Sequence, residues 1–239
     1  MKLRRLIFQL LLGKRLPVTS GTIRVSGIEN PVTVHRDQYG IPHIDAQGEI
    51  DAWYALGFSQ GQDRAFQLEL LLRVANGTLP ADKLSRRIGF AHGAELQLDA
   101  LNSDVKAIYI AFAQGLTEGV RLGCQRVPHE FTMMRTKPTT FTTKDVVSVS
   151  RYLSFLMAPN WKIKLARYHV LKKDGPLALG ALEPWYPEWQ PVSEPSHAIT
   201  GQAIDRLAQD LDLFEHFSGY GGGSNAWAVA ANRTVSGRP

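Results

Sequence analysis

Apolar and polar residues recur along this chain with two periods, and each period predicts its own kind of element. Apolar residues at every second position predict two short strands, at residues 22–25 and 32–35. Spacing of i, i+3, i+4 and i+7 then predicts a long helix from about Glu49 to Ala75. We therefore expect a short β region followed by a long helix.

Helical spacing continues through the middle of the chain. It predicts one helix over residues 82–101 and a second helix after Ser103. The capping box Thr142-x-x-Asp145 predicts the start of another helix. Between these helices, residues 128–131 are predicted to form a loop because they begin with proline.

Length and composition place the chain among ordinary globular proteins. It has 239 residues, of which 44% are hydrophobic and 21% charged, and is long enough for one large or two small domains. The net charge is +5, but the basic residues are spread along the chain and no nucleic-acid-binding motif accompanies them. We therefore expect no nucleic-acid partner. Cys124 is the only cysteine, which excludes an internal disulfide.

The first twelve residues are basic and then apolar, but they predict no membrane span. The apolar run from Leu6 to Leu12 is far shorter than the roughly 20 residues that a bilayer requires. Its charge order resembles that of a signal peptide, yet no small-residue cleavage site follows it. A short N-terminal helix is the simpler interpretation. The location, bacterial periplasm or cytoplasm, stays open.

Candidate chemistry gathers at one serine. Gly221, Gly222 and Gly223 precede Ser224, and alternating residues at 225–230 predict a strand after it. Glycine adopts backbone conformations closed to other residues, so the Gly223 carbonyl can be presented to the Ser224 hydroxyl for an N-to-O acyl shift. Hydrolysis of the resulting ester would leave Ser224 as a new N-terminus.

An N-terminal serine combines two catalytic groups on one residue. The Ser224 hydroxyl is a nucleophile, and a free α-amine, with an ordinary pKa of about 7.7–8.0, can act as its general base. Glycine–serine runs are also typical of flexible linkers. This stretch alone therefore leaves two interpretations open, a processing site and a linker.

Two further motifs lie upstream in the same chain. They are Arg-Asp-Gln-Tyr-Gly-Ile-Pro-His-Ile at residues 36–44 and Gly-Gln-Asp-Arg-Ala-Phe-Gln at residues 61–67. Together with Gly-Gly-Gly-Ser-Asn-Ala-Trp at residues 221–227, they resemble the penicillin amidase family of N-terminal nucleophile hydrolases. The resemblance runs from about Gly21 to Pro239.

The resemblance implies a fold, a maturation step and an activity. The implied fold is α+β, the mostly helical small-subunit portion of a four-layer αββα hydrolase. The implied zymogen cuts itself between Gly223 and Ser224, and the large catalytic subunit that begins at Ser224 is the expected partner. The implied activity is hydrolysis of a linear amide, such as an N-acyl β-lactam, an N-acyl homoserine lactone or a similar N-acyl amine.

The same resemblance suggests four segments and leaves two alternatives. The segments are a possible weak signal at 1–20, the small-subunit domain at 21–190, a linker or spacer at 191–223, and the start of the catalytic subunit at 224–239. Since only one predicted strand follows Ser224, we expect a fragment that is inactive by itself. The alternatives are a truncated, non-catalytic helical remnant or interaction module, and a conventional hydrolase with an internal serine.

One position departs from the family pattern. The resemblance implies a calcium-binding glutamate at position 164, but this chain has Lys164. An ammonium group only donates hydrogen bonds and repels a cation, which puts the calcium site in doubt and predicts no metal ligand here.

By the same resemblance, Phe155 and Met157 are candidates to line the acyl pocket, although ordinary core packing is the favoured interpretation of both.

Two charged pairs have structural interpretations. Arg36 and Asp37 are expected to form a salt bridge that pins the end of a strand. Glu69 and Arg73 are spaced i, i+4 on the long helix and are expected to form a surface ion pair. Neither pair is predicted to be catalytic.

Overall fold

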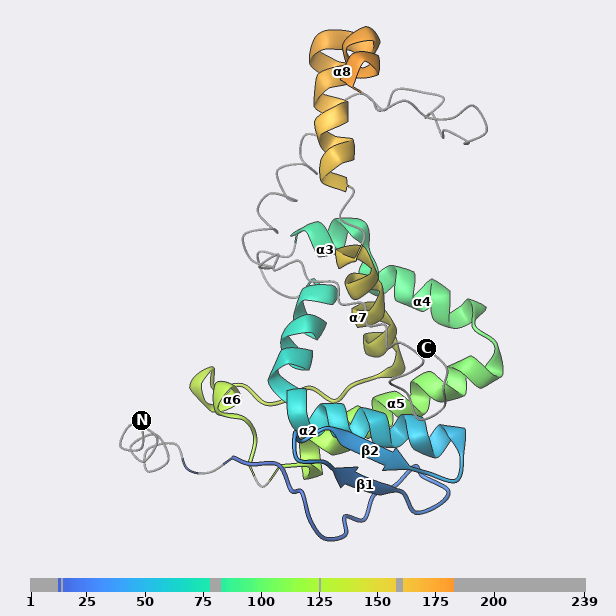
Figure 1. Ribbon diagram of the computed structural model, residues 1–239, viewed down its shortest axis with the longest axis vertical. Coiled ribbons are helices and arrows are strands. Elements are labelled where there is room, and N and C mark those ends of the chain that lie inside the picture. The colour runs from blue at the N-terminus through green and yellow to red at the C-terminus, as the bar shows by residue number, and fades with distance from the viewer. Residues whose placement is uncertain (1–12, 14, 78–82, 125, 158–160, 183–239) are drawn as a thin grey trace, which may run out of the picture. The chain divides into compact units, whose positions relative to one another are not determined.

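The computed structural model describes residues 13, 15–77, 83–124, 126–157 and 161–182 (Figure 1). Its strands are β1 (Thr33–Arg36) and β2 (Pro42–Asp45). Its helices are α2 (Glu49–Ala75), α3 (Lys83–Ile88), α4 (Phe90–Ala100), α5 (Ser103–Leu122), α6 (His129–Met133), α7 (Thr143–Leu156) and α8 (Trp161–Leu182). A mostly helical chain with a small sheet is the α+β class that the sequence predicts.

β1 and β2 form an antiparallel hairpin in which Thr33 pairs with Asp45. Asp37 closes the turn between the strands. Its main-chain carbonyl accepts a hydrogen bond from the Gly40 N–H at 2.9 Å, and its carboxylate accepts one from the Ile41 N–H at 2.9 Å. Gly40 has a φ of +81°, in the left-handed region that glycine adopts without strain.

The strand predicted at residues 32–35 is confirmed as β1, but the strand predicted at residues 22–25 is wrong. Residues 22–25 pair with no other strand in the described part of the chain. Ile23 and Val25 instead line a cavity against α2. Any extended segment points successive side chains to opposite sides, so this period does not by itself require a sheet.

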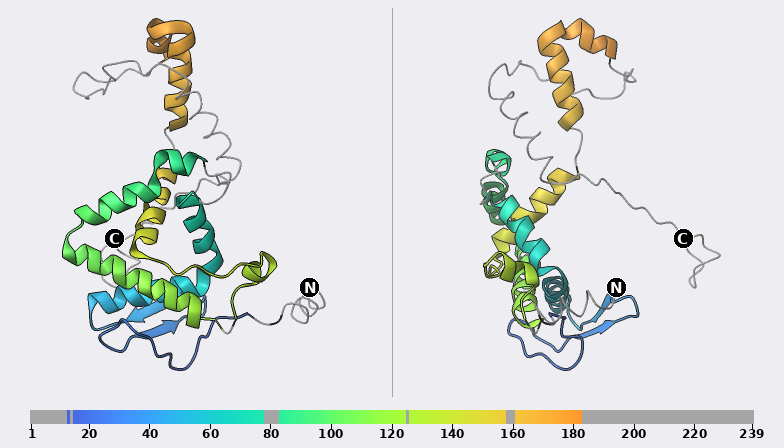
Figure 2. Two further views of the ribbon diagram at one scale, coloured as in Figure 1. Left: turned by 180° about the vertical axis from the view of Figure 1, so that it is seen from behind. Right: turned by 90° about the vertical axis from the view of Figure 1, so that its left-hand side faces the viewer.

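The central contact of the fold is between α2 and α5, which lie side by side (Figures 1 and 2). Gly57 and Gly61 on α2 face α5, and Gly115 and Gly119 on α5 face α2. A Cβ atom at Gly61 would lie 2.3 Å from a main-chain oxygen of α5, and one at Gly119 would lie 2.1 Å from a main-chain oxygen of α2. The two backbones are in contact, which requires glycine at these positions.

A hydrophobic core lies beside this crossing and joins α2, α5, α6 and α7. Its buried members are Ala65, Leu72, Ala113, Leu116, Val120, Phe131, Phe141 and Val146. Phe131 is 1% exposed and meets Phe66 edge to face, with ring centroids 5.5 Å apart. Burying one such side chain stabilises the fold by about 1.5–3 kcal/mol.

Phe131 also explains why the loop predicted at residues 128–131 is wrong. Residues His129–Met133 form the short helix α6, and Pro128 precedes it in an extended conformation with φ −49° and ψ 152°. Proline is tolerated where a helix starts because the first N–H groups have no intrahelical partner. Burial of Phe131 in the core holds this single turn in place.

The helix predicted over residues 82–101 is interrupted, so α3 and α4 are separate helices. Gly89 lies between them with φ +76° and ψ +43°, the left-handed conformation that ends many helices. α4 then packs on α7. Phe90 at the start of α4 meets Tyr152 of α7 edge to face, with ring centroids 5.7 Å apart.

α7 begins at the predicted capping box. Thr142 Oγ1 accepts a hydrogen bond from the Asp145 N–H at 3.2 Å, and the Asp145 carboxylate accepts one from the Thr142 N–H at 2.9 Å. Asn76 Nδ2 donates to Asp145 at 2.9 Å, and Ser148 Oγ donates to Asn76 Oδ1 at 2.9 Å. These bonds fix the start of α7 to the end of α2.

α8 is interrupted at Gly175, where φ is +82° and ψ is 178°. Pro176 follows, and a residue before proline is disfavoured in the helical conformation. Within the described ranges, no helix combines the length and the apolar character that a membrane crossing requires.

Candidate functional site

The predicted nucleophile Ser224 and the predicted processing residue Gly223 both lie outside the described residues. The predicted linker at 191–223 and the segment 224–239 lie outside them as well. The structure does describe the two upstream motifs, at residues 36–44 and 61–67. These motifs are brought into direct contact, and the site is built from them.

Arg36 joins the two motifs. Its guanidinium makes a two-pronged ion pair with Asp63, with Nη1–Oδ2 and Nη2–Oδ1 both 2.9 Å. It also donates to the Gly40 carbonyl at 2.9 Å and to Gln62 Oε1 at 2.6 Å. Arg36 is 15% exposed and Asp63 31%, so the pair is partly shielded from water. Arg36 does pin the end of a strand, but its partner is Asp63 instead of the predicted Asp37.

Asp37 has a separate role in the hairpin turn. Its carboxylate accepts hydrogen bonds from the Ile41 and Tyr39 N–H groups, each at 2.9 Å, and lies 3.3 Å from His43 Nε2. The hydrogen bond from Ile41 is the largest cause that lowers the pKa of Asp37 below its ordinary value. Asp37 and His43 are therefore parts of the turn.

Gln62 connects α2 to the N-terminal segment and to the end of α5. Its Nε2 donates to the carbonyl oxygens of Val18, at 2.8 Å, and Gly123, at 2.7 Å. The Cys124 thiol donates to the Gln62 carbonyl oxygen at 3.4 Å. Burial raises the pKa of this thiol, which favours its protonated form. Through Gln62, the hydrogen bonds around Arg36 thus extend from α2 to the N-terminal segment and to the end of α5.

Asp51, near the start of α2, is 2% exposed. Its carboxylate accepts hydrogen bonds from the N–H groups of Glu29, at 2.8 Å, and Asn30, at 3.0 Å. The bond from Glu29 is the main cause that lowers the pKa of Asp51 below its ordinary value. Asp51 therefore holds residues 29–30 against α2.

Glu69 is a buried carboxylate, which corrects the prediction of a surface pair. It is 2% exposed and accepts a hydrogen bond from Arg73 Nε at 2.8 Å. It also accepts hydrogen bonds from Thr139 N–H, at 2.9 Å, and from Thr139 Oγ1, at 2.8 Å. The predicted i, i+4 ion pair with Arg73 is confirmed. The contact with Thr139, 70 residues away, has no local sequence pattern that could have predicted it.

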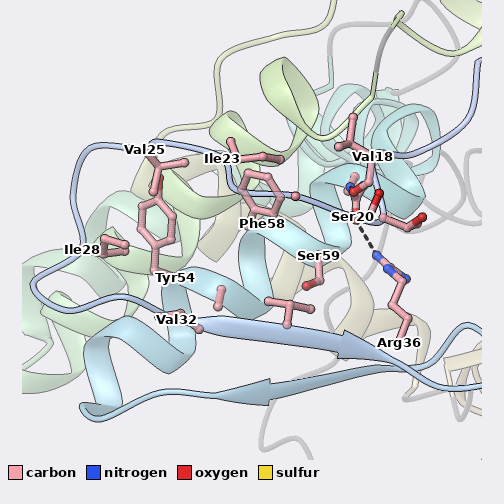
Figure 3. A pocket seen from close by; sticks show the side chains of 15 residues that line it. Val18, Ser20, Ile23, Val25, Ile28, Val32, Arg36, Tyr54, Phe58 and Ser59 are labelled. Carbon is pink, nitrogen blue, oxygen red and sulfur yellow. Dashed lines mark hydrogen bonds between the residues drawn. The ribbon is translucent and has the colours of Figure 1, made fainter.

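A cavity of about 170 Å³ lies between α2, β1 and the N-terminal segment, and we call it the α2–β1 cavity (Figure 3). Ser59 and Phe58 line it from α2, Arg36 lines it from the end of β1, and Ile23 and Val25 line it from the N-terminal segment. Its lining is therefore mixed, with polar groups such as Arg36 and Ser59 beside apolar side chains such as Ile23 and Val25.

A second cavity, of about 420 Å³, lies where α4, α5 and α7 meet. Phe155 lines it and meets Phe90 with ring centroids 5.6 Å apart. Arg151 also lines it and donates to Gln97 Oε1 at 3.2 Å. Met157 is 78% exposed and does not line this cavity. Of the two predicted acyl-pocket residues, the cavity contains only Phe155.

The implied calcium site does not fit this chain. Lys164 is exposed on α8 and offers only donor hydrogens, whereas calcium requires oxygen ligands. Across the described ranges, no group of three or more histidine, cysteine, aspartate or glutamate side chains is placed to hold a metal ion. We therefore derive no role for calcium.

Comparison with known proteins assigns the class and then the family. In fold, the chain resembles a thermostable penicillin G acylase from Alcaligenes faecalis, with a TM-score of 0.51 and 26% identity. That likeness covers 70% of this chain and 98% of the other. The family model of penicillin amidase matches residues 31–239, so the chain belongs to the penicillin amidase family.

Curated relatives carry two kinds of acylase name. The chain is 35% identical to the penicillin acylase 2 proenzyme of Pseudomonas sp. strain SE83, covering 94% of this chain and 31% of that protein. It is 25% identical to the acyl-homoserine lactone acylase QuiP of Pseudomonas aeruginosa, covering 93% of this chain and 28% of that protein. The chain thus spans about a third of the length of these relatives.

Two residues that matter in the described structure were missed from the sequence, Asp51 and Ser59. Gln62 and Glu69 were named, but their distant hydrogen-bond partners were not predicted. A signal for Ser59 was present, because it follows Ala55 by four residues and so shares its buried helix face. The contacts of Gln62 with Val18 and Gly123, and of Glu69 with Thr139, gave no such signal, because these partners lie in distant parts of the chain.

Proposed function

We propose that this chain is part of the precursor of an N-terminal nucleophile amidohydrolase, with Ser224 as its nucleophile after the Gly223–Ser224 bond is cut. The observation that carries the proposal is the family match, which extends through residue 239 and so includes this stretch. Relatives named penicillin acylase and acyl-homoserine lactone acylase support a linear N-acyl amide as the substrate.

The proposed reaction uses the two groups of an N-terminal serine. The Ser224 hydroxyl attacks the amide carbonyl carbon while the α-amine accepts its proton. The C–N bond breaks, the amine product leaves with that proton, and an acyl ester remains on Ser224. Water then attacks the ester and releases the acid, with the α-amine again moving the proton. Hydrogen-bond donors for the oxyanion are also required, and we propose that a large catalytic subunit supplies them.

The described residues have a supporting part in this proposal. The ion pair of Arg36 with Asp63 fixes the hairpin to α2, and Gln62 fixes the N-terminal segment to both helices. Phe155 is the residue that we propose as a wall of the acyl pocket, since it lines a cavity of about 420 Å³. N-acyl β-lactams and N-acyl homoserine lactones are both proposed substrates.

The first test is the intact mass and N-terminal sequence of the product expressed from its native locus. We expect two chains, one of which begins Ser224-Asn225-Ala226. Ser224→Ala removes the hydroxyl that attacks Gly223 and should leave the product uncut. Ser224→Cys keeps a nucleophile and should still be cut. Ser236→Ala is the matched control and should be cut as in the wild type.

Two results would contradict the proposal and select an alternative. A wild-type product that stays as one uncut chain, without amidase activity, would identify a non-catalytic remnant or interaction module. An uncut product that hydrolyses amides would identify a conventional hydrolase with an internal serine. Cutting at another bond, unaffected by Ser224→Ala, would also remove Ser224 as the nucleophile.

A further inference from the structure

Two histidines lie directly opposite each other on the β hairpin. His35 of β1 pairs with His43 of β2, and the centroids of their rings are 6.4 Å apart. The hairpin lies along α2 (Figure 1), and Val34 and Arg36, the chain neighbours of His35, line the cavity between β1 and α2. Successive side chains of a strand point to opposite faces, so His35 and His43 lie on the face turned away from α2. Both histidines are exposed there.

A carboxylate orients one of the two rings. Asp37 Oδ2 lies 3.3 Å from His43 Nε2. An ionised carboxylate only accepts hydrogen bonds, so we assign the ring proton to Nε2, which leaves Nδ1 with a free lone pair. Metal-binding histidines in proteins usually have such a carboxylate on their second nitrogen, because it fixes the ring and raises its basicity. His43 is therefore held in a form that can bind a metal ion through Nδ1.

The charges of the hairpin suit a cation at this place. Asp45 follows His43 by two residues, so its carboxylate is on the same face of the strand. Arg36 is the only lysine or arginine among residues 33–45, and its guanidinium is paired with Asp63 of α2. A cation between the two imidazoles would thus have carboxylates near it and no lysine or arginine of the hairpin opposing it.

We propose that His35 and His43 together bind a divalent ion that prefers nitrogen ligands, Zn²⁺ or Cu²⁺, with Asp37 as the outer partner of His43. Imidazole suits these ions, whereas Ca²⁺ requires oxygen ligands. The two rings must move closer to share one ion at the usual nitrogen–zinc distance of about 2.0–2.1 Å, and exposed side chains can do so by rotating between rotamers.

Water completes the coordination of such an ion. The described ranges contain no group of three or more metal-binding side chains, so the protein contributes two ligands here and the remaining positions stay open to solvent. The site consists of described residues only and does not involve Ser224. It therefore stands or falls separately from the proposed function.

The test is a calorimetric titration of the tag-free 239-residue chain with Zn²⁺ at neutral pH, combined with NMR of the histidine ring protons. We expect saturable binding, with shifts of the ring signals of His35 and His43. His35→Gln should reduce the affinity to that of a single exposed imidazole. Asp37→Asn should weaken binding about tenfold, the lower end of the usual loss when such an outer partner is removed. Ca²⁺ should not bind at the same concentrations.

His92→Gln is the matched control. His92 is also exposed, and its Nδ1 lies 3.6 Å from the Glu95 carboxylate, but it lies on α4 and belongs to no cross-strand pair. This variant should bind Zn²⁺ as the wild type does. Absence of Zn²⁺ binding, unchanged affinity in His35→Gln or in Asp37→Asn, an equal loss in His92→Gln, or Ca²⁺ binding as tight as that of Zn²⁺ would each overturn the inference.

Discussion

Asp51 is a buried carboxylate that holds residues 29–30 to α2. Its buried carboxylate accepts hydrogen bonds from the N–H groups of Glu29 and Asn30. These bonds lower the pKa of Asp51 below the ordinary value of about 3.9. Because the folded-state pKa is the lower one, this stabilisation is fully present above about pH 4. It is lost as the pH falls from there through the folded-state pKa.

We expect Asp51→Asn to lower the free energy of unfolding at neutral pH, since an amide nitrogen cannot accept these N–H groups. The difference from the wild type should shrink as the pH falls below about 4, because the unfolded wild-type chain binds a proton at Asp51 there while the folded carboxylate stays ionised down to its lower pKa. Urea unfolding over a pH series measures both effects. Asp99→Asn, an exposed carboxylate on α4, is the control. A difference that stays constant down to pH 3 would contradict this account.

At this scale, the sequence predicts residue roles only where the partner is near in the chain. Thr142 and Asp145 were identified because a capping box is complete within four residues. Arg36 was recognised as pinning a strand, yet its partner Asp63 is 27 residues away and was assigned wrongly. Glu69 is buried and accepts a hydrogen bond from Thr139, 70 residues away, whereas it was predicted to lie on the surface.

At the scale of elements, helices were predicted well where one apolar face continues without a break. α2 spans Glu49–Ala75 as predicted, even though its backbone bends at Arg64, where φ is −129°. The break between α3 and α4 was missed because apolar spacing continues on both sides of Gly89. The prediction of a strand at residues 22–25 was wrong because apolar and polar side chains alternate along an extended segment packed on a helix just as they do along a strand.

The contact of α2 with α5 yields the element-scale prediction. Gly119→Ala would place a Cβ atom 2.1 Å from the Phe58 carbonyl oxygen, so the two backbones must separate. We expect the free energy of unfolding to fall by about 1–3 kcal/mol, the usual cost of overpacking. The midpoint of urea unfolding should fall at an unchanged m-value.

Gly93→Ala in α4 is the matched control for that experiment. The nearest atoms to a Cβ atom there belong to the guanidinium of Arg151, the far end of a flexible side chain. Alanine also favours a helix over glycine by up to about 1 kcal/mol. Stability of this variant should be unchanged or slightly higher. If Gly119→Ala behaved in the same way, the two backbones would not be in the contact described.

At the scale of the whole molecule, three motifs in one order predicted the family, and the family match agrees. Residues 36–44 and 61–67 are adjacent in space through Arg36 and Asp63, so the recognised motifs are also structural neighbours. The α2–β1 cavity was not predicted, because it forms between segments that meet only after folding. Neither the cavity nor the absence of a hydrogen-bond partner for Ser59 among the described residues leaves a pattern in the sequence.

The proposed reaction leads to a prediction for the 239-residue chain as a whole. Amide hydrolysis requires donors about 2.7–3.1 Å from the developing oxyanion, besides a nucleophile. Residues 224–239 are predicted to add a single strand, and one strand cannot supply both these donors and the walls for an acyl group. We therefore expect no turnover of a chromogenic phenylacetyl anilide by this chain, even after a cut at Ser224. Turnover that Ser224→Ala abolishes and Ser236→Ala preserves would mean that these residues form a complete site, and that the proposed catalytic partner is unnecessary.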